Sequence, residues 1–98
     1  MTATRNVLAA VGGTPVVELQ RIVPGACARV LVKLESQNPT GSMKDRMALA
    51  VVGGAASSGK LAPGGTVVEY TGGSTGTSLA FVCAALGYPI TLVSSDAF

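Results

Sequence analysis

The sequence contains no histidine and no tryptophan, and it has only two cysteines among its 98 residues. Cys27 and Cys83 each stand alone within an apolar stretch, without the CxxC pair that is typical of zinc ligands. A metal site is therefore not expected, and we predict that both thiols lie in the core. Because histidine is absent, any acid–base chemistry must come from another residue type.

Charged residues and long apolar runs are also scarce. Seven basic and five acidic residues give a net charge of +2, and the basic residues are spread along the chain without forming a stripe. We therefore expect no nucleic-acid partner. The longest apolar run, residues 79–86, is far shorter than the roughly 20 residues of a membrane span. The apolar run in the first 13 residues is short, so we expect no secretion signal there. We expect a cytoplasmic protein without a membrane partner.

Aromatic residues make up only 4% of the chain, whereas hydrophobic residues make up 48%. The core must therefore be built from valine, alanine and leucine, which fill the layers around parallel sheets well. This composition favours an α/β fold over a small β-barrel. With 98 residues, the chain is at most one domain of the usual size of about 100 to 150 residues, or a part of one.

Turn signals and apolar patterns predict alternating helices and strands. The first part predicts a short helix at 7–11, an extended segment at 16–19, a strand at 28–36 and a largely buried helix at 43–59. The second part predicts a buried strand at 66–70, a helix at 79–86 ended by Gly87, and a strand at 89–95. The second group forms a βαβ unit, and its first loop lies at the sheet edge where ligands bind.

The segment "TGGSTGTS", residues 71–78, places glycines and hydroxyls just before and within the start of a helix. Unpaired N–H groups and the positive end of the helix dipole attract an anion there, such as a carboxylate or a phosphate. The glycines allow a close backbone approach and positive φ angles. Hydroxyl donors are available at Thr71, Ser74, Thr75 and Thr77. The loop is thus a candidate anion-binding site.

Two other interpretations of this loop remain open. A triphosphate-binding P-loop requires a lysine after the last glycine, but Gly76 is followed by Thr77. Gly73 and Gly76 supply only half of a dinucleotide fingerprint, although Asp96 follows the next strand, where an acid would meet a ribose. A nucleotide-binding βαβ module is therefore one alternative, and a tight turn capped by threonine or serine is the other.

Lys44 stands at the predicted start of the helix that follows "QNPTGS". A cation in the first helical turn faces the positive end of the helix dipole, and Asp45 offsets this only in part. One interpretation is an ordinary solvated lysine beside an acid. The other is a nucleophilic amine, because the chain has no histidine and lysine forms Schiff bases with carbonyl cofactors.

Two motifs, "NPTGSMKDR" at residues 38–46 and "EYTGGSTGTSLA" at residues 69–80, resemble the cysteine synthase family of fold-type II pyridoxal-phosphate enzymes. The opening "VGGTPVVEL" is similar to the first segment of that family, so the resemblance covers essentially the whole chain. It implies the three-layer α/β parallel-sheet fold of these enzymes, here incomplete. Residues 1–40 would be the first segments of the larger domain, and residues 41–98 the start of the smaller βαβ domain.

The resemblance also implies a reaction and a set of site residues. Lys44 would hold pyridoxal 5′-phosphate as a Schiff base and then act as the base on the α-carbon of the amino-acid substrate. The reaction implied is β-replacement on an activated serine, such as O-acetylserine, in which sulfide adds to give cysteine. A homodimer is implied for the full-length enzyme. The loop that would bind the substrate carboxylate comprises Thr71, Gly72, Gly73, Ser74 and Thr75.

The sequence departs from the family pattern in the loop and in length. Ser74 stands beside the expected position of the cofactor's 3′-oxygen, where the family commonly has asparagine, and Gly72 stands where serine is common. A serine hydroxyl can still donate a hydrogen bond to the cofactor. The family continues to a second glycine-rich loop that binds the cofactor phosphate, and these 98 residues contain no counterpart. We therefore interpret the chain as an N-terminal fragment that is inactive by itself.

Alternatives also remain at the level of function. Threonine dehydratases and cystathionine β-synthases share the lysine and the loop, and most of the residues that separate them lie outside these 98. In the nucleotide-binding alternative, both loops merely cap helices and no lysine Schiff base forms.

Overall fold

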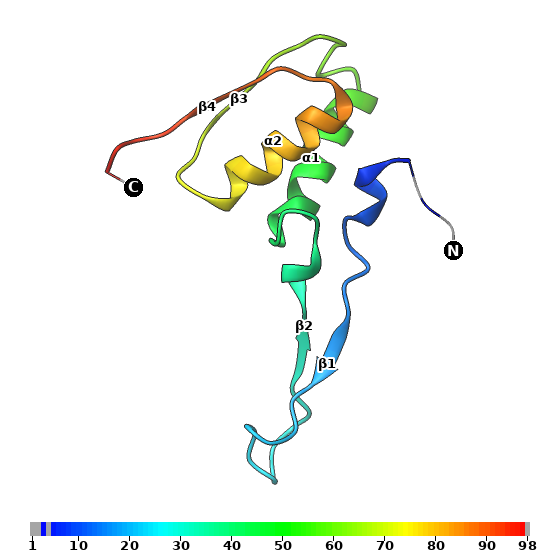
Figure 1. The fold of residues 1–98 in the computed structure, drawn as a ribbon, viewed down its shortest axis with the longest axis vertical. Coiled ribbons are helices and arrows are strands. Elements are labelled where there is room, and N and C mark those ends of the chain that lie inside the picture. Colours follow the sequence, from blue (N-terminus) through cyan, green and yellow to red (C-terminus); the bar gives the residue numbers. More distant parts are fainter. Residues whose placement is uncertain (1–2, 4, 98) are drawn as a thin grey trace.

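The computed structural model describes residue 3 and residues 5–97. Within them, two 3-10 helices, two α-helices and four strands follow one another. They are η1 (Val7–Ala10), β1 (Val16–Glu18), β2 (Leu31–Lys33), η2 (Glu35–Gln37), α1 (Lys44–Ser57), β3 (Val67–Tyr70), α2 (Ser74–Leu86) and β4 (Ile90–Val93). Figure 1 shows that β1 and β2 form a hairpin that projects from a head made of the two α-helices, β3 and β4.

The head contains the predicted βαβ unit. β3 pairs with β4 in parallel, with Val68 opposite Thr91 and Tyr70 opposite Val93. α2 connects the two strands and ends at Gly87, whose φ of 82° is the left-handed conformation that glycine adopts easily. The predicted order of strand, helix and parallel strand is therefore confirmed, and the loop before α2 follows the carboxyl end of β3.

The hairpin strand is shorter than predicted. β2 pairs antiparallel with β1, but the strand expected over residues 28–36 is limited to Leu31–Lys33. Asn38 accounts for the early C-terminal end, because its backbone N–H and its side-chain amide both donate to the Glu35 carbonyl. These local bonds form a 3-10 turn in place of the ladder bonds that would continue the strand.

A small apolar core lies between α1 and α2. Its members are Leu8, Ala48, Val52, Leu79, Val82 and Cys83. The prediction that the helix at 43–59 is largely buried is wrong, because the buried residues of α1 are Asp45, Ala48 and Val52 alone among those described, and Val51 is 57% exposed. The prediction that β3 is a buried strand is also wrong. Val67 packs against the core, but Val68 on the opposite face of the strand is 63% exposed, since no described segment covers that face.

The two cysteines occupy different environments. Cys83 is buried, as predicted, and burial raises the pKa of its thiol. Cys27 is exposed, so its predicted place in the core is wrong. It lies between β1 and β2, in the turn region of the projecting hairpin, where its sulfur contacts only the neighbouring carbonyl of Ala28 by hydrogen bonding.

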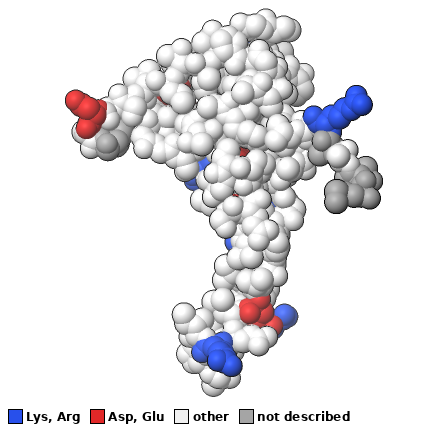
Figure 2. All heavy atoms as spheres, in the orientation of Figure 1, with Lys and Arg blue, Asp and Glu red and all other residues white. Residues whose placement is uncertain are grey.

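The molecule is extended and exposes much apolar surface. Its radius of gyration is 17.1 Å, whereas a compact domain of about 100 residues has a radius of gyration of about 13 Å. Figure 2 shows a largely uncharged surface over the head in this view. Within the described residues, no helix is long and apolar enough to cross a membrane. The exposed apolar side chains of the head include Val51, Val68, Tyr70, Leu92 and Val93.

We predict that residues 1–98 do not fold cooperatively when expressed alone. The core has six buried apolar residues in the part of the chain that the structure describes, while whole domains are stable by only about 5 to 15 kcal/mol. The exposed strand edges and apolar faces favour association instead. Circular dichroism melts and gel filtration measure this. A single cooperative melt of a monomer would contradict the prediction.

Candidate active site

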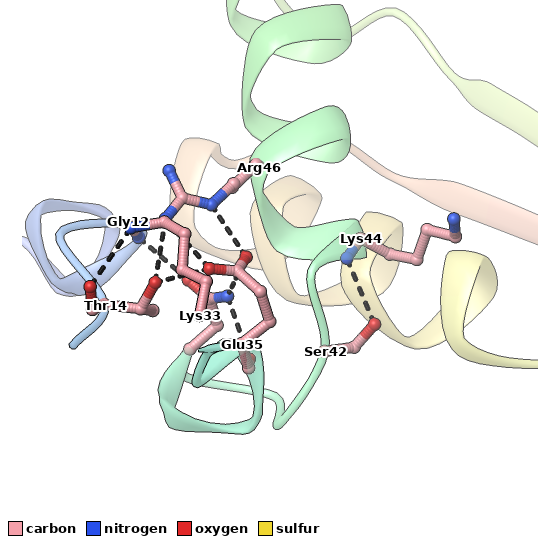
Figure 3. Close-up of polar contacts among 8 residues, drawn as sticks. Gly12, Thr14, Lys33, Glu35, Ser42, Lys44 and Arg46 are labelled. Atoms are coloured by element: carbon pink, nitrogen blue, oxygen red, sulfur yellow. Dashed lines mark hydrogen bonds and ion pairs between the residues drawn. The ribbon is translucent and has the colours of Figure 1, made fainter. Parts of the chain in front are cut away.

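Lys44 is the first residue of α1, as the sequence predicts. The chain enters the helix through Ser42, whose hydroxyl accepts a hydrogen bond of 3.0 Å from the Lys44 backbone N–H. The Lys44 side chain is half-buried, and Figure 3 shows it extending away from the polar group around Glu35 and Arg46. In residues 3 and 5–97, its Nζ atom has no hydrogen bond or ion pair. The amine is therefore available to a ligand.

Asp45, the next residue, is fully buried and joins three segments. The Thr40 backbone N–H donates to its Oδ2 atom at 2.8 Å, and the Thr40 hydroxyl donates to Oδ1 at 2.5 Å. From α2, the Ser78 hydroxyl donates to Oδ1 at 2.6 Å. Both Asp45 and Ser78 have a relative exposure of 0%. This carboxylate therefore holds the first turn of α1 against the first turns of α2.

The pKa of Asp45 is set by two opposing effects. Burial raises the pKa, because it disfavours the charged carboxylate. The hydrogen bonds from Ser78 and Thr40 stabilise that charge, and together they hold the pKa below its ordinary value. Asp45 is therefore ionised at neutral pH although its hydrogen-bond donors are all uncharged.

A second polar cluster ties α1 to the base of the hairpin. Arg46 Nε donates to Glu35 Oε2 at 2.8 Å, and Arg46 Nη2 donates to Glu35 Oε1 at 3.1 Å (Figure 3). The Thr14 hydroxyl donates to the same carboxylate. Asn38 donates to Glu35 Oε2 at 3.0 Å and accepts from the Gly12 N–H at 2.8 Å. The chain before β1 thus contacts both η2 and α1.

The Glu35 carboxylate is strongly stabilised in its charged form. Its pKa is lowered from 4.5 to about 2, chiefly by the hydrogen bond from Arg46 and then by the one from Thr14. Desolvation of the carboxylate opposes the shift. The first turn of α1, which carries Lys44, is therefore fixed by two contacts. Asp45 bonds it to α2, and Arg46 bonds it to Glu35.

The loop before α2 is built around a close approach of Thr71 to Gly76. Thr71 Oγ1 accepts hydrogen bonds from the backbone N–H groups of Gly73 at 3.3 Å and Gly76 at 3.2 Å. A Cβ atom on Gly76 would lie 2.5 Å from Thr71 Cγ2, so a side chain there would displace Thr71. The sequence predicts positive φ angles for the glycines of this loop. Gly73 does not have one, because its φ of −161° is extended backbone. Glycine is required at Gly76 for space.

Backbone donors remain open at the start of α2. Gly76 and Thr77 donate to the Gly73 carbonyl, whereas the N–H groups of Ser74 and Thr75 have no partner in the described part of the chain. The same loop borders an open hollow of about 560 Å³ whose lining includes Thr71, Gly73 and Thr77, although Ser74 and Thr75 do not line it. Because Thr71 Oγ1 accepts two backbone bonds, its hydroxyl can serve a ligand only as a donor. The loop can bind an anion through these groups.

The structure brings the two predicted parts of the site near each other without joining them. The bond from Ser78 to Asp45 places the N-terminus of α1 beside that of α2. Lys44 lines a different hollow, of about 540 Å³, together with Met43 and Met47. The lysine and the anion-binding loop thus belong to adjoining surfaces.

Sequence patterns alone missed the residues that hold the site. The signal for Asp45 was present, because Asp45, Ala48 and Val52 are spaced to share one helix face. Ser78 similarly adjoins the apolar run at 79–86. The contacts of Arg46 with Glu35 span 11 positions, and no local pattern indicated them.

Comparison with known proteins identifies the family to which this chain belongs. A family model described as "Pyridoxal-phosphate dependent enzyme" matches residues 7–97. The chain therefore belongs to the family of pyridoxal-phosphate dependent enzymes.

Within this family, the similarity is to cysteine synthases and related enzymes. The chain is 57% identical over 83 residues to a cysteine synthase of Staphylococcus aureus, which covers 85% of this chain and 27% of the relative. It is 47% identical over 98 residues to the O-ureido-L-serine synthase of Streptomyces lavendulae, covering 100% of this chain and 30% of that relative.

Comparison with solved structures shows a similarity to the same group of enzymes. The O-acetyl serine sulfhydrylase isoform 3 of Entamoeba histolytica superposes with a TM-score of 0.91 at 36% identity, over 99% of this chain and 30% of that chain. The expected α/β fold is confirmed. The chain spans less than a third of the length of these relatives.

The stabilising role of the Glu35 cluster can be tested in a chimeric enzyme. In this chimera, residues 1–98 replace the corresponding segment of the S. aureus cysteine synthase. Because the folded pKa of Glu35 is lowered from 4.5 to about 2, its ionised form stabilises the fold above the ordinary pKa, and this contribution is lost as pH falls toward the folded pKa. Glu35→Gln should therefore lower the melting temperature at pH 6, by an amount that shrinks between pH 4.5 and 2.

The matched control is Glu69→Gln, on the exposed strand β3. Melting temperatures are measured by scanning fluorimetry across the pH range. A difference between the chimera and its Glu35→Gln variant that stays constant with pH would contradict the assignment.

Proposed function

We propose that this chain carries the lysine and the substrate-carboxylate loop of a pyridoxal-phosphate enzyme that makes cysteine from an activated serine and sulfide. The observation that carries the proposal is the buried Asp45, which holds the first turn of α1, and with it Lys44, beside the N-terminus of α2. A reactive amine and an anion-binding loop are thereby on neighbouring helix ends. The names of the relatives support the choice of reaction.

The residues present fit the cofactor. Lys44 offers an amine that has no partner in the described chain, and the hollow of about 540 Å³ beside it has the size of ordinary ligand sites, about 300 to 1,000 Å³. Lys44 would bind the aldehyde carbon. The Ser74 hydroxyl, at the start of α2 and outside the lining of this hollow, is proposed to donate to the ring oxygen. When bound, pyridoxal phosphate supplies an electron sink for charge that develops on the substrate α-carbon.

Lys44 has two roles in this proposal. Its Nζ atom would hold the cofactor, and the same amine would accept the proton from the substrate α-carbon. The position suits both roles, because the Lys44 amine has no hydrogen bond or ion pair within residues 3 and 5–97 and is open to a ligand. The net reaction exchanges the acetate of O-acetylserine for hydrosulfide and yields cysteine.

The loop from Thr71 to Thr75 would orient the substrate. The free N–H groups of Ser74 and Thr75 and the hydroxyl hydrogen of Thr71 would donate to the substrate carboxylate. Gly72 and Gly73 carry no side chain, so the carboxylate can approach the backbone. These directional hydrogen bonds would fix the substrate α-carbon relative to the Lys44 amine.

The remaining parts of the proposal concern the whole enzyme. We propose that residues 1–40 begin its larger domain and residues 41–98 its smaller domain, which agrees with the hairpin projecting from the head (Figure 1). A cytoplasmic homodimer remains our prediction for the complete enzyme. Residues 1–98 alone should show no cysteine formation, because they contain no second loop to orient the cofactor phosphate.

Lys44→Ala in the chimera should abolish covalent cofactor binding and cysteine formation, since Lys33, which lines the same hollow, already donates from its Nζ to the Thr14 carbonyl at 3.1 Å. The measurements are the visible absorbance that survives gel filtration, the mass of the borohydride-reduced protein, and turnover. Lys60→Ala removes an exposed lysine beyond the end of α1 and is the control. Turnover retained by Lys44→Ala would refute the assignment.

Thr75→Ala should weaken amino-acid binding more than cofactor binding. Losing one hydrogen bond to a charged carboxylate costs roughly 1.5 to 3 kcal/mol, so the apparent affinity for the amino acid should fall by about 10- to 150-fold. Thr66→Ala, just before the amino end of β3, is the control. If cofactor affinity fell while amino-acid affinity held, the loop would be a phosphate site instead.

A further inference from the structure

The bond between Ser78 and Asp45 is the one side-chain hydrogen bond recorded between α1 and α2 in the described residues. The rest of the contact between these helices is apolar and involves small side chains such as Ala48, Val52 and Val82. Apolar packing is non-directional, so it resists separation of the helices more strongly than small rotations or shifts along them. A short bond between two fully buried polar groups fixes one register.

The two partners of this bond adjoin the two halves of the proposed site. Asp45 follows Lys44 directly, in the first turn of α1. Ser78 lies four residues after Ser74, one turn above the start of α2. A shift of α2 relative to α1 would therefore move the loop relative to the Lys44 backbone.

Thr40 completes the arrangement. Its hydroxyl lies 3.4 Å from the Ser78 hydroxyl, and both donate to Asp45 Oδ1. No cation forms an ion pair with Asp45 in the described residues, so its three hydrogen bonds must offset the cost of burying the charge. Because a carboxylate accepts along preferred directions, these donors hold Asp45 in one orientation.

We propose that Asp45 and Ser78 are positioning residues that set the distance between Lys44 and a carboxylate bound at the start of α2. The inference rests on the proposed function and deepens it. The loop that binds the carboxylate then also orients the substrate, because the bound carboxylate places the substrate amine and α-carbon at a fixed position relative to Lys44 Nζ. Without the bond, the loop can still bind a carboxylate, but the geometry between the two helix ends is no longer fixed.

The test compares two amines that differ only by the carboxylate, L-serine and ethanolamine. Each is mixed with the cofactor-loaded chimera, and the rate of the absorbance change is measured by stopped flow. In the parent chimera, L-serine should react faster than ethanolamine. In Ser78→Ala this advantage should fall by about fivefold or more, because misplacement by about 1 Å can cost up to about a hundredfold in rate.

Ser78→Ala keeps Asp45 hydrogen-bonded to Thr40, so the buried charge retains two donors and the fold is expected to survive. Cys83→Ala is the matched control, since it removes one heavy atom from an equally buried position on the same helix. It should lower stability to a similar degree and leave the ratio of the two rates unchanged. Ser78→Thr, which restores the hydroxyl, should recover part of the carboxylate advantage.

The outcomes separate this inference from the proposed function. If Lys44→Ala retains bound cofactor and turnover, the proposed function is wrong. If Lys44→Ala is inactive but Ser78→Ala keeps the full advantage of L-serine, the positioning role is refuted and the proposed function stands. A loss of rate that is equal for both amines in Ser78→Ala would also refute it, because a merely structural defect has that effect.

Discussion

The arrangement of this site depends on a buried carboxylate whose neighbours are all neutral donors. Asp45 accepts hydrogen bonds from the Thr40 backbone, the Thr40 hydroxyl and the Ser78 hydroxyl, and it is fully buried. A charge in such a place is costly unless its bonds are complete. The turn before α1, the first turn of α1 and the first turns of α2 must therefore come together in one geometry. The position of Lys44 follows from that requirement.

Local features of the site could be predicted from sequence because they depend on neighbouring residues. The helix start at Lys44, the left-handed cap at Gly87 and the βαβ order all arise from short-range patterns. The loop was also placed correctly, although Gly76 serves to admit Thr71 and not to supply a positive φ. The residues proposed for cofactor and carboxylate binding stay predictions.

Burial could not be predicted to the same extent, because it depends on which segments meet in space. An apolar strand such as β3 suggested a covered sheet, yet Val68 and Tyr70 are exposed. An aspartate is rarely buried, so the helix face that it shares with Ala48 and Val52 does not by itself predict its burial. The strand predicted at 28–36 extends too far at its C-terminal end because Asn38 bonds locally to Glu35. The predicted burial of Cys27 is wrong because its hairpin projects from the core.

The two polar clusters beside Lys44 should respond differently to ionic strength. The ion pair between Arg46 and Glu35 is partly open to solvent, with side-chain exposures of 40% and 22%. Mobile ions screen such charges over a Debye length of about 8 Å at physiological salt. Asp45 is out of reach of those ions, and its partners carry no charge to be screened. Salt should therefore loosen the connection between α1 and the hairpin while the alignment of α1 with α2 persists.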